Sequence, residues 1–599
     1  MKKITLLILI FATTKCISQI YFGATANMYV KNEVLFVTQD INLAATSNLY
    51  LRNNAQLLQG TTSTSTNTGA GVISVYQEGT SDNFDYNYWC SPVGNASATI
   101  GNENFGITML GKPTTSTAST AATILPATNS NGTSNPLAIA AKWIYKLTNA
   151  NNYSQWVFVG GTSALAAGEG FSMKGTSGTD ATDPEGTGVT NNPGGAQRYD
   201  FIGKPNDGNI TITLGANNAT LTGNPYPSAL HLNAFLLDGS NLATNGIAYF
   251  WEQDKTVNSH TLIAYKGGYG SYAPVDLVSS GVYIPATFNS YKADGSLNST
   301  GPSSGLAIDR RYSPIGQGFV INANANGTAT FKNSHRVFVK EGTSASQFEK
   351  HVSTEKTAKK DEVTGEVIEE VSHFKLNTII NNEFTRQIAL AFVPQATDGI
   401  DVGIDALNMD DALPNDVTFW LQDASYVIQG INFDETKKIA LNAKVTTATT
   451  FKFYIPEVIN FDNSQNIYLY DALDNSYHDI KNGTYQVDVA PGIYNDRFKI
   501  TFKSETSLGT GSETFKKFFI TQDNTNSKLI ASNPNNLSLK SFKLYDVLGK
   551  TVLSKKDLGT DENYTFSTSG LSNGIYITEF LTIDNERFTE KIVISNAGK

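Results

Sequence analysis

Short segments in which apolar and polar residues alternate recur along most of this chain, and this feature limits the fold more than any other. Clear cases are NITITL at 209–214, RFKITFK at 497–503 and SFKL at 541–544. A period of two places successive side chains on opposite faces of a strand, so that one face packs on a core and the other meets water. No comparable pattern supports a long amphipathic helix. The sequence therefore predicts an all-β fold with several antiparallel β-sandwich units.

The N-terminus has the pattern of a secretory signal peptide. A basic start at 1–3 precedes a short apolar stretch at 4–12. We therefore expect residues 1–18 to be absent from the exported protein. A lipoprotein signal at Cys16 is the weaker alternative, because Lys15 stands where such signals place a small residue. A membrane-spanning helix needs about 20 apolar residues, and no segment reaches that length, so we expect no transmembrane span.

The charge balance argues against a nucleic-acid partner. The formal net charge is −10 and the isoelectric point is about 5.2, and lysines and arginines form no cluster. Phosphate backbones require a concentrated basic surface. Cys90 is the only cysteine left after signal removal, so no intramolecular disulfide is expected. Its aromatic surroundings favour a buried structural cysteine over a nucleophile.

Changes in composition and one internal similarity divide the chain into regions. Very short apolar pieces between 20 and 59 predict either a small β-solenoid or a compact β-meander. Within 71–340 the order of a turn, an aromatic strand and a G-x-G-F motif occurs twice, which indicates a diverged duplication. The two copies are Trp89–Pro92, Trp143–Tyr145 and Gly168–Phe171, and then Gly223–Ser228, Tyr249–Trp251 and Gly316–Phe319. The expected regions are the signal peptide 1–18, the short-strand region 19–70, the two β units 71–215 and 216–340, a charged linker or hairpin 341–371, a β-sandwich domain 372–504, a linker 505–514 and a C-terminal unit 515–599.

The C-terminal unit resembles the C-terminal sorting domains of the type IX secretion system of Bacteroidetes. The matching motifs are Leu544–Lys550 (LYDVLGK), Leu571–Tyr576 (LSNGIY) and Lys591–Ile594 (KIVI). The residues that we assign to the sorting motif are Tyr545, Asp546, Gly549, Lys550, Gly574, Ile575, Tyr576 and Lys591. The resemblance implies a small immunoglobulin-like sandwich that directs passage from the periplasm through the outer membrane, with the secretion machinery as partner. Both Gly549 and Gly574 are expected in turns that need a positive φ.

Two further observations qualify this resemblance. Common members open with a Pro-Asn-Pro turn, whereas this chain has Ser532–Asn535 (SNPN), which indicates the type A class or a variant of it. The remainder of the chain resembles large flavobacterial secreted proteins of undefined role. The segments concerned are Tyr88–Pro92, Gly223–Ser228, Gly316–Val320 and Ala396–Asp401. This second resemblance implies an extracellular or outer-membrane surface location and no activity.

Motifs that carry chemistry in other proteins lack their required context here. Gly301–Gly305 (GPSSG) matches the G-x-S-x-G of serine hydrolases, but it lies in a Ser/Gly-rich stretch with no strand-to-helix turn expected. Gly549-Lys550-Thr551 lacks the glycine that a phosphate-binding loop needs five positions earlier. The six histidines are dispersed, with no pair at metal-ligand spacing. We therefore expect no enzyme and no cofactor.

One acidic segment is a candidate calcium site. Asp398, Asp401 and Asp405 are separated by glycines and apolar residues, with Asp410 and Asp411 close behind. Calcium takes six to eight oxygen ligands, which such a loop can supply. The spacing is not that of an EF-hand, and capping of turns between strands is the simpler interpretation.

These observations predict a non-enzymatic, adhesin-like or structural protein of the cell surface. The alternative is an extracellular protein that binds or degrades polysaccharides, with surface glycans or matrix as partners. Hydrolysis requires two facing carboxylates, and the sequence alone pairs none. Sugar binding requires exposed aromatic rings, whereas tryptophan in a β-sandwich usually belongs to the core. We accordingly expect Trp89, Trp143, Trp156, Trp251 and Trp420 to be core residues.

Overall fold

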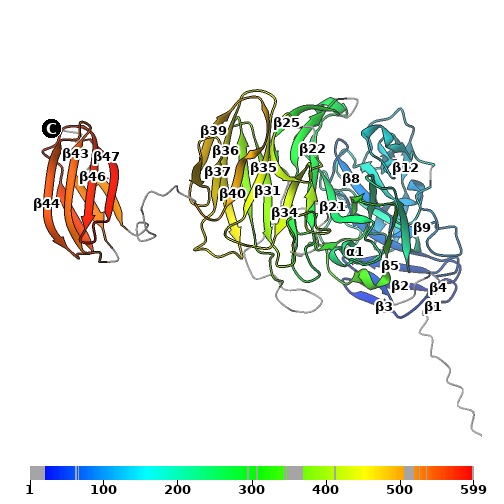
Figure 1. Ribbon diagram of the computed structural model, residues 1–599. Helices are drawn as coiled ribbons and strands as arrows, with labels where there is room; N and C mark the ends of the chain where they lie inside the picture. The colour runs from blue at the N-terminus through cyan, green and yellow to red at the C-terminus, as the bar shows by residue number, and fades with distance from the viewer. Residues whose placement is uncertain are drawn as a thin grey trace, which may run out of the picture. The chain divides into compact units, whose positions relative to one another are not determined.

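A computed structural model describes residues 20–595 except 61–63, 65–66, 163, 293–295, 305–307, 343–345, 347, 349–367, 410–412, 505–517, 525 and 534–535. The chain divides into two compact units, 1–504 and 505–599 (Figure 1). The described residues are almost all strand or connection, with one short α-helix, α1 (Leu232–Leu236), and five 3-10 helices of three residues each. The all-β prediction is therefore confirmed. Most of the expected charged linker, the linker 505–514 and the signal peptide lie outside the described residues.

The first strands form a parallel β-solenoid. The strands are β1 (Ile20–Phe22), β2 (Asn27–Lys31), β3 (Val34–Val37), β4 (Ile41–Leu43), β5 (Asn48–Arg52) and β6 (Gln56–Gln59). Each strand of the first turn pairs in parallel with its counterpart in the second: β1 with β4, β2 with β5, and β3 with β6. A meander would pair neighbouring strands antiparallel, so the solenoid is the alternative that the chain adopts. Strand β5 also pairs in parallel with β7 (Val72–Glu78), so the expected boundary at 70 crosses one continuous sheet.

Two sets of five strands follow, and they share one pairing scheme. The first set is β7, β8 (Tyr86–Cys90), β14 (Tyr145–Lys146), β16 (Gly170–Lys174) and β17 (Arg198–Pro205); the second is β18 (Ile210–Leu214), β19 (Ala219–Gly223), β21 (Thr244–Gln253), β27 (Gly318–Ala323) and β28 (Gly327–Phe331). In each set the first strand pairs with the last. The fourth strand lies between the second and the third and pairs with both. This correspondence supports the duplication. It also places the start of the second copy at β18, before the boundary expected at 215.

The register agrees between the copies residue by residue. Gly170 lies opposite Cys90, and Gly318 lies opposite Gly223. Phe171 and Phe319, which follow the strand glycines, are fully buried. Two residues before each strand, Gly168 and Gly316 have φ angles of 84° and 79°, a region that only glycine enters freely.

The two copies cross closely where their G-x-G-F strands begin. A Cβ atom on Gly170 would lie 2.7 Å from the carbonyl oxygen of Thr222 in the second copy. A Cβ atom on Gly318 would lie 2.6 Å from the carbonyl carbon of Tyr88 in the first copy. Because Tyr88 and Leu221 occupy equivalent positions next to these contacts, the crossing is nearly symmetric. Glycine is required at both places because a backbone passes directly over it.

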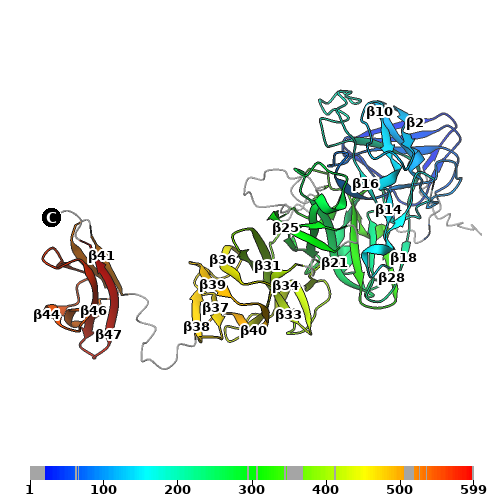
Figure 2. The same cartoon turned by 90° about the horizontal axis from the view of Figure 1, so that it is seen from above.

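A third region packs an eleven-stranded sheet against the second copy. The strands are β30 (His373–Ile380), β31 (Phe384–Phe392), β32 (Ala406–Leu407), β33 (Asn415–Leu421), β34 (Ala424–Ile431), β35 (Lys438–Val445), β36 (Thr449–Ile459), β37 (Tyr468–Asp471), β38 (Ser476–Asp479), β39 (Tyr485–Val489) and β40 (Gly492–Thr501). Tyr249 and Val320 of the second copy share one apolar cluster with Phe374 and Phe419 of this sheet. Figure 2 shows the sheet beside β21 and β25 of the second copy. The shared core explains why residues before 504 form a single unit.

The remaining strands complete these sheets and their connections. They are β9 (Val93–Gly94), β10 (Leu110–Thr115), β11 (Ala118–Ala121), β12 (Thr123–Leu125), β13 (Ala138–Ala140), β15 (Val157–Phe158), β20 (Ala229–His231), β22 (Lys266–Ala273), β23 (Val282–Ile284), β24 (Thr287–Tyr291), β25 (Leu297–Ser304), β26 (Tyr312–Ser313) and β29 (Arg336–Val337). The stretch 301–304 of the serine-hydrolase motif lies within β25, where we had expected a loop. A hydrolase serine needs a sharp turn into a helix, and a continuous strand does not provide one.

The C-terminal unit is a separate sandwich of two antiparallel sheets. One sheet contains β41 (Phe519–Asp523), β42 (Lys528–Ser532) and β45 (Asn563–Ser567), and the other contains β44 (Thr551–Gly559), β43 (Leu539–Asp546), β46 (Gly574–Thr582) and β47 (Arg587–Ile594). Phe542, Leu544 and Ile592 are buried between the sheets. Ile575 and Ile577 are 41% and 45% exposed, because Tyr576 between them takes the inward position. The small sandwich is therefore confirmed.

Candidate functional site

The three sorting motifs, far apart in sequence, meet at one end of the four-stranded sheet of the C-terminal unit. Asp546 pairs with Tyr576 and Tyr545 pairs with Ile577 across β43 and β46. Ile577 in turn lies opposite Lys591 on β47. Tyr545, Ile577 and Lys591 therefore form one transverse row on the outer face of this sheet. Antiparallel pairing produces this row because directly opposed residues point to the same side.

Asp546 shapes the hairpin between β43 and β44. Its carboxylate accepts hydrogen bonds from the backbone N–H groups of Leu548 and Lys550, each at 3.0 Å. Gly549 has a φ of 79°, so the expected positive φ is confirmed there. Gly574 differs from expectation: it begins β46 opposite Ile594 and is not among the glycines with positive φ. Strand pairing, rather than a tight turn, accounts for its position.

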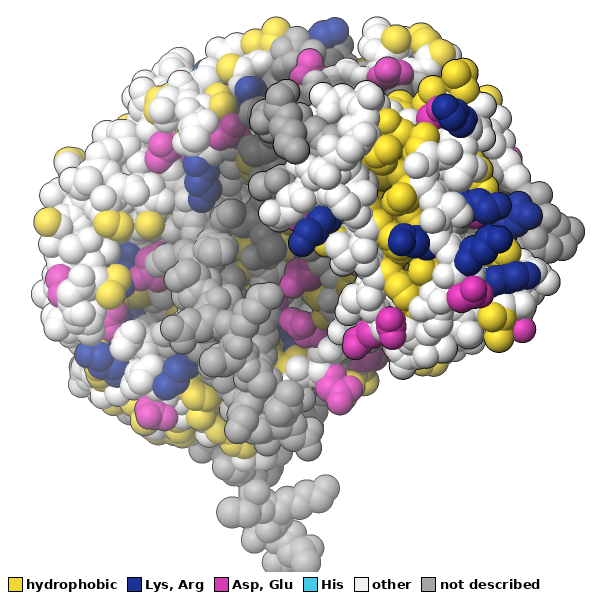
Figure 3. All heavy atoms as spheres, turned by 90° about the vertical axis from the view of Figure 1, so that its left-hand side faces the viewer, with side chains coloured by type: hydrophobic (Ala, Val, Ile, Leu, Met, Phe, Trp, Pro, Cys, Tyr) yellow, Lys and Arg dark blue, Asp and Glu magenta, His cyan; other side chains and the backbone are white. Residues whose placement is uncertain are grey.

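The outer face of this sheet exposes apolar side chains. Ile575 lies directly opposite Val593, which is 55% exposed. On the face of the molecule drawn in Figure 3, hydrophobic side chains form a stripe with lysines and arginines along it. An apolar patch rimmed by charge is typical of a surface that binds a protein partner.

The acidic segment at 398–405 caps turns. The Asp401 carboxylate accepts the backbone N–H of Thr397 at 2.7 Å. Asp405 accepts the N–H groups of Asp401 and Gly430 at 2.6 and 2.8 Å, and Asp398 forms an ion pair with Lys437. Within the described ranges no group of three or more acidic, histidine or cysteine side chains is arranged to hold a metal ion. Asp410 and Asp411 lie outside those ranges, and calcium binding stays a prediction.

Other candidate groups are structural. Cys90 is fully buried at the crossing of the two copies, and burial raises the pKa of its thiol. A thiol reacts as its thiolate, so this environment keeps Cys90 unreactive. Among the described residues no helix is long and apolar enough to cross a membrane.

A pocket of about 480 Å³ lies where the two copies and the third region meet. The first copy contributes the loop 150–156, the second contributes 217–219, 245, 269 and 322–324, and the third region contributes 400–409 and Tyr426. Tyr269 belongs to β22, while Asn322 and Ala323 end β27. The walls thus come from three segments that also contribute residues to one apolar cluster.

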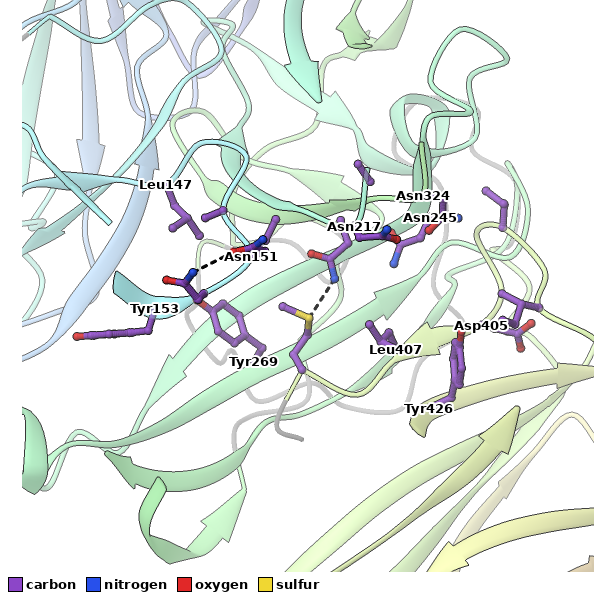
Figure 4. Close-up of a pocket in the computed structure, with 18 of the residues that line it drawn as sticks. Leu147, Asn151, Tyr153, Asn217, Asn245, Tyr269, Asn324, Asp405, Leu407 and Tyr426 are labelled. Carbon is purple, nitrogen blue, oxygen red and sulfur yellow. Dashed lines mark hydrogen bonds between the residues drawn. The ribbon is translucent and has the colours of Figure 1, made fainter. Parts of the chain in front are cut away.

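Asparagines dominate the polar part of the pocket. The lining contains Asn151, Asn152, Asn217, Asn245, Asn322 and Asn324. Figure 4 shows Asn151, Asn217, Asn245 and Asn324 along one side of the pocket, across from Tyr269, Leu407 and Tyr426. Asn322 donates to the sulfur of Met409 at 3.1 Å, and Asn245 donates to the hydroxyl of Tyr249 at 2.9 Å. The sequence alone does not reveal this cluster, because asparagine is common in this chain and the six positions show no regular spacing.

Aromatic rings form much of the remaining wall. Trp156 is half-buried and packs on Tyr88, with 5.8 Å between the ring centroids. Tyr153, three residues earlier, is 48% exposed. The Tyr269 hydroxyl is hydrogen-bonded to that of Tyr88 at 3.0 Å, which orients the ring. The expectation that all five tryptophans are core residues was wrong, since only Trp89 is fully buried.

Asp405 is the only acidic side chain among the described lining residues, and no lysine or arginine accompanies it. Burial raises its pKa to about 7 despite two backbone hydrogen bonds that favour the ionised form. Burial also raises the pKa of the neighbouring Tyr426. The pocket is therefore polar but close to neutral.

Comparison with known proteins gives little at the level of whole chains. No curated protein matches the chain. Among solved structures, PorZ, a surface component of the type IX secretion system of Porphyromonas gingivalis, is 11% identical over 75% of this chain and 50% of that chain, with a TM-score of 0.12. The BSP domain of a biofilm associated protein is 9% identical over 88% of this chain and 96% of that chain, again with a TM-score of 0.12. This chain therefore spans half the length of the first structure.

Two family models match the chain. Residues 523–595 match the model described as secretion system C-terminal sorting domain, which bears out the resemblance of the C-terminal unit. The protein is therefore a substrate of the type IX secretion system and is exported to the cell surface or beyond. Residues 119–502 match the model described as domain of unknown function (DUF8693), a range that joins most of the first copy, the second copy and the third region. Because this match covers more than half of the sequence, the chain belongs to the DUF8693 family.

Proposed function

We propose that this protein is a non-enzymatic, adhesin-like component of the surface or extracellular matrix of a Bacteroidetes-type bacterium. The observation that carries the proposal is the combination of a type IX sorting domain with a large β-sheet unit. A signal peptide at 1–18 provides entry to the periplasm, and the outer face with Tyr545, Ile577 and Lys591 provides contact with the secretion machinery. Residues before 504 then act outside the cell.

The composition of the pocket supports a binding role over a catalytic one. Asp405 is the single carboxyl group of the described lining, and two backbone N–H groups already bind it. Hydrolysis of a glycosidic bond uses two carboxyl groups on opposite sides of the bond. Of the alternative function, binding or degradation of polysaccharides, we therefore propose only binding at this pocket.

The first test concerns export. Deletion of 515–599 should leave the protein in the periplasm, while thermal unfolding of the remaining unit changes little, because the two units have separate cores. Fusion of this segment to a foreign periplasmic protein should carry that protein outside. A truncated protein that still reached the surface or medium in normal amount would contradict the role of the segment.

The second test concerns adhesion. A strain without the gene should attach less to surfaces and to neighbouring cells than its parent. Reintroduction of the full gene should restore attachment, and a gene without the codons for 515–599 should not. Unchanged attachment in the deletion strain would refute the adhesive role and leave the export route intact.

A further inference from the structure

We propose that the pocket lined by the six asparagines binds a neutral carbohydrate, as the end or a short stretch of a glycan chain. The inference deepens the adhesive function proposed above, on which it rests, by naming the site and the class of ligand. Three properties of the pocket carry it: unpaired side-chain amides, accessible aromatic faces, and the lack of basic groups in the described lining.

The amide groups suit hydroxyl groups, which donate and accept hydrogen bonds together. Within the described part of the chain, the side-chain amides of Asn217 and Asn324 form no hydrogen bond, and both residues are exposed to the pocket. The side-chain oxygen of Asn151 accepts one hydrogen bond from Asn152, and the side-chain NH2 group of Asn151 keeps its two donors. An amide offers two donors and an oxygen with two lone pairs, which matches adjacent sugar hydroxyls. Several such groups on one side can fix the orientation of a ring.

The aromatic side chains suit the C–H faces of a sugar ring. Trp156 and Tyr153 come from the loop before β15, and Tyr269 stands on β22. The indole N–H of Trp156 has no acceptor among the described residues, so a ligand hydroxyl can take it. Tryptophan and tyrosine combine a large apolar face with a polar handle, and a sugar presents the same combination.

Charge and topology disfavour other ligand classes. Phosphate, sulfate and uronate groups are bound through lysine and arginine, which the described lining lacks. Extended peptides commonly bind by adding to a free strand edge. Of the wall strands, β21, β22 and β27 are paired on both sides, whereas the two-residue strand β32 pairs only with β34. The longer wall strands therefore offer no such edge.

The test measures binding of neutral and acidic oligosaccharides by the full mature protein. Titration calorimetry with oligomers of glucose, mannose, galactose and N-acetylglucosamine would be compared with uronic-acid oligomers of equal length. Asn217→Gly removes one amide and keeps the backbone, because the φ of Asn217 is 60° and glycine adopts that value freely. Asn324→Ala removes a second amide, and Trp156→Phe keeps a ring but removes the N–H. Tyr21→Ala is the matched control, since Tyr21 is 70% exposed on the solenoid.

We expect at least one neutral oligomer to bind, and each amide variant to weaken binding by about three- to tenfold. Trp156→Phe should weaken it by a similar factor, and Tyr21→Ala should not change it, with the thermal midpoint of each variant close to that of the parent. The inference fails if no neutral oligomer binds, if uronic-acid oligomers bind better, or if the variants bind like the parent. If sugar binding fails while the deletion strain still loses attachment, only the pocket assignment is wrong. If sugar binds in the pocket and attachment is unchanged, only the adhesive function is wrong.

Discussion

The near-symmetric crossing of the two copies leads to a sharp prediction about two glycines. Gly170→Ala and Gly318→Ala should destabilise the protein by nearly equal amounts, although the residues are far apart in sequence. In each variant the new methyl group would lie within 2.7 Å of backbone atoms of the other copy. Backbone atoms cannot rotate away as the end of a side chain can, so the sheets themselves must separate.

The expected magnitude follows from this geometry. Overpacking of a well-packed core costs about 1–3 kcal/mol. Because the new methyl group contacts backbone atoms in both variants, we expect a loss at the upper end of this range, about 3 kcal/mol. Unfolding entropy is about 2 cal/mol/K per residue, so for a unit that ends at Ser504 this corresponds to a fall of about 3 °C in Tm. Gly239→Ala is the control, because a Cβ atom there would have nothing within 4 Å and its φ is not positive. Its effect should stay within about 0.5 kcal/mol.

Urea unfolding of the mature protein, followed by tryptophan fluorescence, is a suitable assay. All five tryptophans belong to the first unit, so the signal reports on that unit alone. The reasoning would be refuted if both variants unfolded at the urea midpoint of the parent. It would also fail if one variant lost about 3 kcal/mol and the other lost nothing, because the two positions would then not be equivalent.

Three further predictions concern single side chains. Arg336→Met should destabilise the first unit by about 3–5 kcal/mol in urea unfolding, because the fully buried Asp207, which lies 2.9 Å from Arg336, then has no ion-pair partner. The double variant Arg336→Met, Asp207→Leu should recover part of this stability, and a double variant less stable than Arg336→Met would contradict the prediction. Burial raises the pKa of Asp405 in the folded state from 3.8 to about 7. Between these pH values the folded state keeps the proton that the unfolded state has lost. The free energy of unfolding therefore falls as pH rises, by at most about 4 kcal/mol. Asp405→Asn should flatten this part of the pH profile in thermal unfolding, and a parallel profile would exclude Asp405 as its cause. Ile577→Asp, on the outer face of the C-terminal unit, should reduce export of the protein without lowering its Tm. Ile583 is 59% exposed and lies outside the sorting motifs, so the Ile583→Asp variant should be exported normally. Equal export of the two variants would contradict a role for that face.

Local alternation determined much of the C-terminal unit. The alternating segment 541–544 lies within β43, and Gly549 lies in its predicted turn. The side of β46 that faces the core was not determined in this way. Ile575, Tyr576 and Ile577 are all residues that strands favour, so either face could be buried. Tertiary packing decided it, since Tyr576 and Phe580 complete the core around Phe542.

The all-β class, the repeated G-x-G-F motif and the sorting motifs were determined by the sequence itself, because each depends on residues close together in the chain. Only the tertiary structure decided that the first strands pair in parallel as a solenoid and that Gly170 and Gly318 cross the opposite copy. It alone brought Asn151, Asn217 and Tyr426 into one pocket. The physical reason is that alternation and turn formation are local, whereas strand direction, close backbone approach and the walls of a pocket arise from contacts between segments hundreds of residues apart.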